Sequence, residues 1–208
     1  FRADHRDVLV SPLGTLDDLP LGAHVGSSSL RRQAQLLSYR PDLRMAPIRG
    51  NVGTRLRKLD NGDYDAIVLA AAGVERLGLS RSDVHPIAIE TCLPAPGQGA
   101  LGVECAVNSP ALEFLQPLID VDLDRCIRAE RGISAGLGAD CALPVAAMAV
   151  LTESAEISLS ALVADATGQR ILKAQALGND PAEVSRAVVQ QLYAAGAQEL
   201  LDSVRRTK

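Results

Sequence analysis

The sequence has almost no aromatic residues. Tryptophan is absent, and phenylalanine and tyrosine together make up 2% of the 208 residues. Proteins that bind single strands of nucleic acid stack the bases on such side chains, and the net charge of −4 also disfavours a phosphate backbone. Apolar runs of the roughly 20 residues that span a bilayer are missing as well. We therefore expect neither nucleic acid nor a membrane as a partner.

Metal-binding patterns are missing too. The four cysteines form no Cys-x-x-Cys pair, and the three histidines do not cluster near them. A zinc site is therefore not expected. Residues 1–7 are charged rather than apolar, so they do not resemble a secretory signal, and we expect a cytoplasmic protein with reduced thiols.

Positive charge is concentrated in one part of the chain. Residues 21–60 contain eight cations and two anions, a local net charge of +6 in a chain whose total is −4. Several of these cations stand beside Gly, Ser or Thr turns that precede helical patterns. Helix N-termini offer free backbone N–H groups, and arginine grips carboxylate or phosphate with two parallel hydrogen bonds. The segment therefore predicts a site for a small ligand with several negative groups.

The first half alternates between strand and helix patterns. Strands are predicted at 23–25, 44–48 and 66–70, and helices at 28–39 and 51–59. This alternation predicts an α/β domain with a mainly parallel sheet, of the periplasmic-binding-protein kind. Ligands of such sheets bind at the carboxyl ends of the strands. Residues 27–29 and 49–54 should therefore lie on one edge of the sheet.

The second half has a different pattern. A Pro/Gly-rich stretch at 91–99 reads as a hinge, followed by a predicted strand at 100–105 and a weak helix at 108–118. Next come a predicted helix at 123–137, three predicted strands at 145–151, 157–164 and 170–176, and a final helix that runs to Leu200 or Leu201. Asp180 is the expected N-cap of this final helix, and Pro181 follows it. This order predicts a small α-β-β-β-α open-faced sandwich.

Short motifs within these elements occur in a characteristic order. The longest are Ser-Ser-Leu-Arg-Arg-Gln at 28–33, Arg-Gly-Asn-Val-Gly-Thr-Arg-Leu at 49–56 and Pro-Ala-Pro-Gly-Gln-Gly-Ala at 94–100, with shorter ones at 58–59, 65–67, 72–73 and 76–78. Together they resemble the porphobilinogen deaminase (hydroxymethylbilane synthase) family. The resemblance implies a monomeric transferase of tetrapyrrole and heme biosynthesis. Such an enzyme joins four porphobilinogen units head to tail, releasing ammonia, on a covalently bound dipyrromethane cofactor.

The resemblance also implies a domain map and a set of site residues. Residues 1–4 would end domain 1, 5–93 form the α/β domain, 94–118 a hinge and a segment returning to domain 1, and 119–208 the cofactor-anchoring domain. The family's catalytic aspartate would lie upstream, so no catalytic residue is assigned, and we expect impaired turnover and exposed apolar residues at 100–117. The residues implied to bind the cofactor are Cys141 (through a thioether), Ser27, Ser29, Arg31, Arg32, Arg49, Gly50 and Arg55, and those implied to bind substrate are Arg49, Arg55 and Arg76.

The residues around the anchoring cysteine depart from the family pattern. Ala139-Asp140 and Ala146 stand where the family has glycines.

The sequence also leaves two alternative functions open. One alternative is a non-catalytic anion-binding module of the periplasmic-binding-protein type. Another is a phosphate or nucleotide binder built on the turn at 50–54, although the Gly-Lys-Ser/Thr of a P-loop is missing. Arg40, Arg44, Arg57 and Lys58 are interpreted as a solvated basic face.

Overall fold

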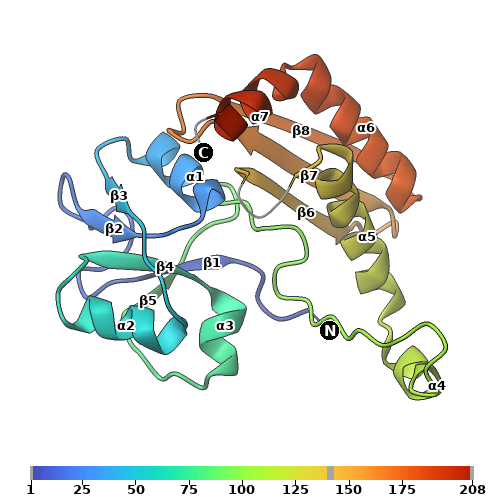
Figure 1. Ribbon diagram of the computed structural model, residues 1–208, viewed down its shortest axis with the longest axis horizontal. Coiled ribbons are helices and arrows are strands. Elements are labelled where there is room, and N and C mark those ends of the chain that lie inside the picture. Colours follow the sequence, from blue (N-terminus) through green and yellow to red (C-terminus); the bar gives the residue numbers. More distant parts are fainter. Residues whose placement is uncertain (1, 140–142, 207–208) are drawn as a thin grey trace.

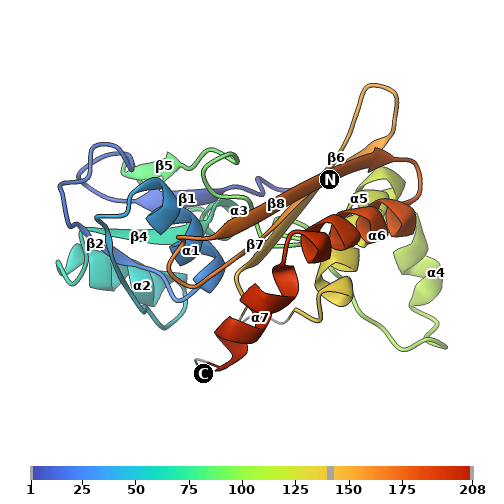
Figure 2. The same cartoon turned by 90° about the horizontal axis from the view of Figure 1, so that it is seen from above.

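The computed structural model describes residues 2–139 and 143–206, which form two lobes (Figure 1). The first lobe is built on a five-stranded sheet and the second on a three-stranded sheet. Figure 2 shows helices α5 to α7 on one side of the second sheet, while its other side turns toward α1 of the first lobe. No helix in the described part of the chain is long and apolar enough to cross a membrane.

The five-stranded sheet has the strand order β3-β2-β4-β1-β5. Strand β2 pairs in parallel with β3 and β4, whereas β1 runs antiparallel to both of its neighbours, β4 and β5. All strands except β1 therefore point the same way, and the predicted mainly parallel sheet is confirmed. The strands are β1 (Asp7–Val10), β2 (His24–Gly26), β3 (Arg44–Ala46), β4 (Ala66–Ala70) and β5 (Val84–Pro86).

Helices cover both faces of this sheet. Helix α1 (Leu30–Tyr39) buries Leu36 against one face, and helices α2 (Val52–Asp60) and α3 (Ala71–Arg76) bury Leu56, Leu59 and Val74 against the other. The central strand β4 is buried on both sides, because its alternate residues point into the two apolar clusters. Strands β1 and β5 and helix α3 have no counterpart in the elements expected from the sequence.

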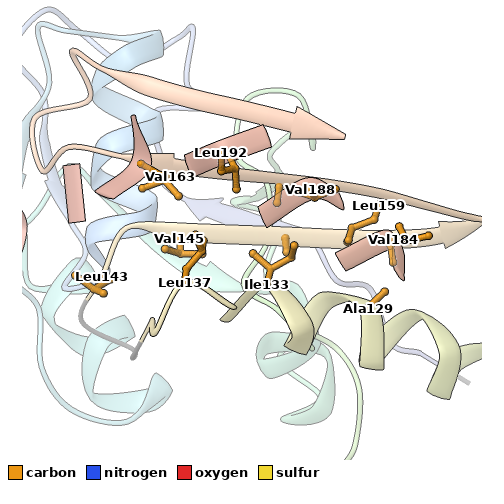
Figure 3. Close-up of a cluster of buried hydrophobic side chains, with 14 of the residues drawn as sticks. Ala129, Ile133, Leu137, Leu143, Val145, Leu159, Val163, Val184, Val188 and Leu192 are labelled. Atoms are coloured by element: carbon orange, nitrogen blue, oxygen red, sulfur yellow. The ribbon is translucent and has the colours of Figure 1, made fainter. Parts of the chain in front are cut away.

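The second lobe confirms the open-faced sandwich. Antiparallel strands β6 (Val145–Leu151), β7 (Ile157–Ala164) and β8 (Ile171–Gly178) follow helix α5 (Val121–Gly136) and precede helix α6 (Pro181–Ala194). Figure 3 shows side chains of α5 and α6, such as Ile133 and Leu192, facing those of the sheet. Each fully buried aliphatic side chain of this cluster contributes roughly 1.5–3 kcal/mol by leaving water.

The C-terminal region is one helix longer than expected. The Asp180 side chain accepts a hydrogen bond from the Glu183 backbone N–H at 2.8 Å, so the predicted N-cap is confirmed. The predicted single helix to Leu200 or Leu201 is wrong. Gly196 takes a positive φ of 100° and separates α6 from helix α7 (Ala197–Arg206), and this backbone conformation is open chiefly to glycine.

The segment between the lobes contains no strand, so the strand predicted at 100–105 is wrong. Residues 101–106 are irregular, and the weak helix reduces to α4 (Leu112–Leu115) and a 3₁₀ turn, η1 (Gln116–Leu118). A strand needs a neighbour for its backbone hydrogen bonds, and none of the described strands pairs with this segment. Its side chains are exposed as expected, with Leu101 at 72%, Val107 at 86% and Phe114 at 76%.

The turn between β7 and β8 docks against helix α1. Ala34 of α1 packs with Ala146, Leu162 and Ala164 of the three-stranded sheet. Gly168, at the tip of the turn, is buried and has a positive φ of 73°. A side-chain carbon at this position would overlap the carbonyl oxygen of Ala34 and approach the Ser38 backbone nitrogen to 2.9 Å. The two lobes can therefore meet this closely only with glycine at the tip.

Replacing Gly168 by alanine should loosen the contact between the lobes. We expect Gly168→Ala to lower the free energy of unfolding by roughly 3–4 kcal/mol, from backbone strain plus steric overlap. Gly62→Ala is the matched control, because Gly62 also has a positive φ, 81°, but no atom within 4 Å of the added carbon. It should lose only about 1 kcal/mol. Equal losses in urea unfolding would contradict the docking role.

Candidate functional site

Two turns meet at one edge of the five-stranded sheet. The Ser27 backbone N–H, just after β2, donates to the carbonyl of Ala46 at the end of β3, at 2.9 Å. The Ser28 hydroxyl donates to the carbonyl of Ile48 at 2.8 Å and accepts from the Ile48 N–H at 2.9 Å. The carboxyl ends of parallel strands meet at one edge. The expected neighbourhood of residues 27–29 and 49–54 is therefore confirmed.

Both predicted serines have local structural contacts. Ser27 is buried, and its hydroxyl oxygen accepts from the Ser29 N–H at 3.3 Å. Ser29 is the N-cap of α1 and accepts from the Arg32 N–H at 3.5 Å. Asn51 caps α2 in the same way, accepting from the Thr54 N–H at 2.9 Å. The edge therefore carries two capped helix N-termini, where the macrodipole favours negative charge.

The adjacent arginines of α1 share one buried carboxylate. Asp7, the first residue of β1, has no exposed surface. One of its oxygens lies 2.7 Å from Arg31 Nη1, and the other lies 2.7 Å from Arg32 Nη2. Two cations and one anion leave a formal charge of +1, so the cluster can take up a further carboxylate without an excess of negative charge.

The electrostatics of this cluster follow from its burial. Burial by itself would raise the pKa of the Asp7 carboxyl, but the guanidinium charges of Arg31 and Arg32 outweigh it and lower that pKa to about 2. The Cys92 thiol lies 3.3 Å from the same carboxylate, and its pKa shifts upward instead of downward. Burial and the charge of Asp7 raise the pKa of Cys92 to about 12. Cys92 is therefore a protonated core residue rather than a nucleophile.

Gln98 connects this cluster to the hinge and to the second lobe. Its side-chain amide donates to Asp7 Oδ1 at 2.9 Å and accepts from Arg31 Nη2 at 3.2 Å. Its backbone carbonyl accepts from Arg2 Nε at 2.9 Å. Arg2 in turn forms a two-point ion pair with the fully buried Glu130 of α5, at 2.7 and 3.0 Å.

The other predicted arginines carry unpaired charge. Arg49, Arg55 and Arg76 form no ion pair with the rest of the described chain. The Arg55 Nε donates to the carbonyl of Gly50 at 2.8 Å, which holds its side chain at the turn. Gly50 itself has a positive φ of 114°, and an added carbon would come 2.7 Å from Thr54 Cγ2. Gly50 therefore shapes the turn that presents Arg49.

Arg76 and Arg40 stand apart from this group. Arg76 is exposed at the end of α3, whose Gly73 faces Val52 at the start of α2. Arg40 does not belong to a solvated basic face as predicted. It pairs with Asp42 at 2.7 Å and donates to the carbonyl of Leu16 at 2.7 Å, so it ties the loop before β2 to the end of α1.

Cys141, the predicted anchor of the cofactor, lies outside the described residues. Its described neighbours Ala139 and Leu143 belong to the apolar core of the second lobe, against which Leu30 at the start of α1 also packs. Leu30, Ala139 and Leu143 therefore contact a common core.

Sequence reasoning missed Asp7 and assigned no role to Gln98. Asp7 opens an apolar strand, Asp-Val-Leu-Val, and an acidic residue leading such a run is a signal for a buried partner of a cation. Gln98 lies inside the motif at 94–100, whose prolines and glycines predict a hinge rather than a buried hydrogen-bonding side chain.

Comparisons with known proteins agree with the motifs. Residues 1–113 match the model "Porphobilinogen deaminase, dipyromethane cofactor binding domain", and residues 125–194 match "Porphobilinogen deaminase, C-terminal domain". The porphobilinogen deaminase of Acidithiobacillus ferrooxidans is 50% identical over 206 residues, which cover 98% of this chain and 67% of that protein. The corresponding proteins of Geobacillus sp. and Stenotrophomonas maltophilia are 46% and 47% identical, over 98% and 97% of this chain and again 67% of theirs.

The pairing of Asp7 predicts a specific dependence of stability on acid. Its folded-state pKa of about 2 lies below the ordinary 3.8, so its contribution is fully present above about pH 4 and is lost as pH falls toward 2. The difference in unfolding free energy between wild type and Asp7→Asn should therefore shrink by on the order of 2 kcal/mol between pH 5 and pH 2. Glu113→Gln, which removes an exposed carboxylate of α4, should show no such change. A pH-independent difference for Asp7→Asn in urea unfolding would contradict the assignment.

Proposed function

This chain belongs to the porphobilinogen deaminase family, and we propose that it serves tetrapyrrole and heme biosynthesis as a hydroxymethylbilane synthase. The reaction joins four porphobilinogen units head to tail and releases one ammonia per unit. The observation that carries the proposal is the Arg31–Arg32 pair on Asp7, which lies inside the matched region 1–113 with one positive charge uncompensated. Unpaired Arg49 and Arg55 lie on the same edge of the sheet.

The residues of this edge fit a dipyrromethane cofactor. Each pyrrole ring of the family's cofactor carries two carboxylates, and arginine is the side chain best suited to grip them. We assign the contacts with the cofactor to Arg31, Arg32, Arg49 and Arg55, supported by Ser27, Ser29 and Gly50, and its thioether bond to Cys141. When bound, the cofactor supplies the primer whose free pyrrole carbon receives the next unit.

The chain's own residues bind and orient the substrate. We propose that Arg49, Arg55 and Arg76 hold the acetate and propionate groups of incoming porphobilinogen, because none of them has an ion-pair partner in the described chain. Arg49 and Arg76 are exposed, and Arg55 is half-buried. Fixing these groups positions the aminomethyl carbon against the acceptor ring. Ammonia leaves that carbon, the new carbon–carbon bond forms, and the acceptor carbon loses its proton. We assign no residue of this chain as the catalytic carboxylate.

The arrangement of the lobes supports the proposed domain map. The five-stranded sheet and its helices fall within 5–93, and the three-stranded sheet with α5 to α7 falls within 119–208. We propose that residues 94–118 form the hinge and returning segment, and that residues 1–4 end a preceding domain. By the same family relationship we propose a monomeric enzyme of the cytoplasm.

The covalent anchor is tested by the intact mass of the purified chain. We expect an adduct of two porphobilinogen units less their ammonia, located on Cys141 by peptide mapping and absent from Cys141→Ser. The adduct on another cysteine would contradict the assignment of Cys141. A chain incubated with porphobilinogen that acquires no adduct and binds carboxylates reversibly would instead favour a non-catalytic anion-binding module.

The role of Arg49 is tested against a neighbouring arginine. Arg49→Ala should reduce cofactor loading by about tenfold, because a carboxylate loses a charge-assisted two-point contact, while the melting temperature changes by less than about 2 °C. Arg57→Ala is the control, since Arg57 is also exposed on this segment and forms no ion pair in the described chain. It should load normally. Full loading of Arg49→Ala with a large fall in melting temperature would make Arg49 structural.

A further inference from the structure

The Asp7 carboxylate distributes its two oxygens between the two arginines. Arg31 Nη1 contacts Oδ2 at 2.7 Å, whereas Arg32 contacts Oδ1 through Nη2 at 2.7 Å and Nε at 3.1 Å. From this geometry we propose that Asp7 is a positioning residue that holds Arg31 and Arg32 side by side to receive a single ligand carboxylate. The inference rests on the proposed function, in which that carboxylate belongs to porphobilinogen or to the dipyrromethane made from it.

The remaining contacts of the pair are with neutral acceptors. Arg31 Nη1 also donates to the carbonyl of Leu93 at 2.7 Å, and Arg32 Nη1 donates to the carbonyl of Val68 at 3.3 Å. With five N–H groups on each guanidinium, both arginines keep N–H groups for which no described residue is an acceptor. In this proposal, a ligand carboxylate would bind to these remaining donors and neutralise the +1 charge of the cluster.

Asp7 is itself held rigidly. It is the first residue of β1, paired with Ala70 of β4, and its carbonyl accepts from the Ile87 N–H at 2.9 Å. Its side chain also accepts from Gln98 Nε2 at 2.9 Å. A fixed carboxylate reduces the freedom of two long side chains before a ligand arrives, and preorganisation of this kind improves affinity.

If Asp7 competed with the ligand for the arginines, its removal would change the affinity for anions in the opposite direction. If Asp7 only competed with ligand carboxylates for the arginines, removing its charge would raise the cluster from +1 to +2 and strengthen the binding of anions. If Asp7 positions the arginines, removing its charge lets the two like charges move apart, and binding weakens. The sign of the change therefore separates positioning from competition.

The test measures the affinity of the full chain for porphobilinogen by titration calorimetry, beside the intact mass of the cofactor adduct. We expect Asp7→Asn to bind porphobilinogen at least about tenfold more weakly. The matched control is Glu130→Gln, which removes the charge of another buried carboxylate paired with an arginine. It should lose stability comparably but keep its affinity within about threefold.

A second variant leaves the Asp7–arginine charges intact in case Asp7→Asn does not fold. Gln98→Leu removes one hydrogen bond to Asp7 and one to Arg31, and should weaken binding by about threefold. Gln191→Leu, which loses a hydrogen bond to the Gln175 carbonyl in the second lobe, should leave affinity unchanged.

The outcomes separate this inference from the function on which it rests. Wild type that neither binds porphobilinogen nor carries the adduct would overturn the proposed function and the inference with it. Wild-type binding combined with unchanged or tighter binding by Asp7→Asn would overturn the positioning role alone. If only Gln98→Leu can be measured, an affinity equal to that of wild type would overturn it as well.

Discussion

The buried carboxylate of Asp7 is the interaction on which the rest of this structure depends. Three charged side chains, Asp7, Arg31 and Arg32, lie where water is largely excluded. Removing ions from water is costly, and only close pairing with further hydrogen bonds offsets that cost. Because Asp7 starts β1 and the arginines start α1, this pairing fixes the helix against the sheet at the edge where the ligand is proposed to bind.

The same network continues through the hinge into the second lobe. Gln98 joins Asp7 to Arg2, and Arg2 joins Glu130, whose carboxylate also accepts from the backbone N–H groups of Gly97 at 2.6 Å and Ala149 at 2.8 Å. Residues far apart in the sequence thus form one continuous set of charge-assisted hydrogen bonds. Leaving one of its buried charges unpaired would cost about 3–5 kcal/mol, so the network contributes to the stability of the packing between the lobes.

Much of the fold could be predicted because its signals are local. The apolar run of β4, the alternation before it and the Asp180 cap each lie within a few residues of sequence. Strand β5 has only three residues, one of them proline, and α3 follows β4 without a turn, so neither gave a signal. The strand expected at 100–105 fails for a non-local reason, since β-structure requires a partner that the sequence pattern does not reveal.

In the candidate site, too, the local signals could be predicted and the non-local contacts could not. The arginines were predicted because they stand in motifs beside helix starts, but their buried partner Asp7 lies 24 residues before Arg31 and Glu130 lies 128 residues after Arg2. No periodicity connects such positions. Sequence reasoning therefore identified the cations that a ligand could contact and missed the anions that hold some of them in place. It also misjudged Arg40, whose partner Asp42 and carbonyl contacts make it structural.

Counting charge at the edge shows what the proposed ligand requires. The cluster of Asp7, Arg31 and Arg32 contributes +1, and Arg49 and Arg55 contribute one each, since neither has an ion-pair partner in the described chain. A dipyrromethane with two carboxylates per ring would bring one more negative charge than these residues neutralise. The N-termini of α1 and α2 open onto the same edge, and together they supply partial positive charge of about the missing size. In the proposed function, the helix starts are therefore part of the binding site as well as of the fold.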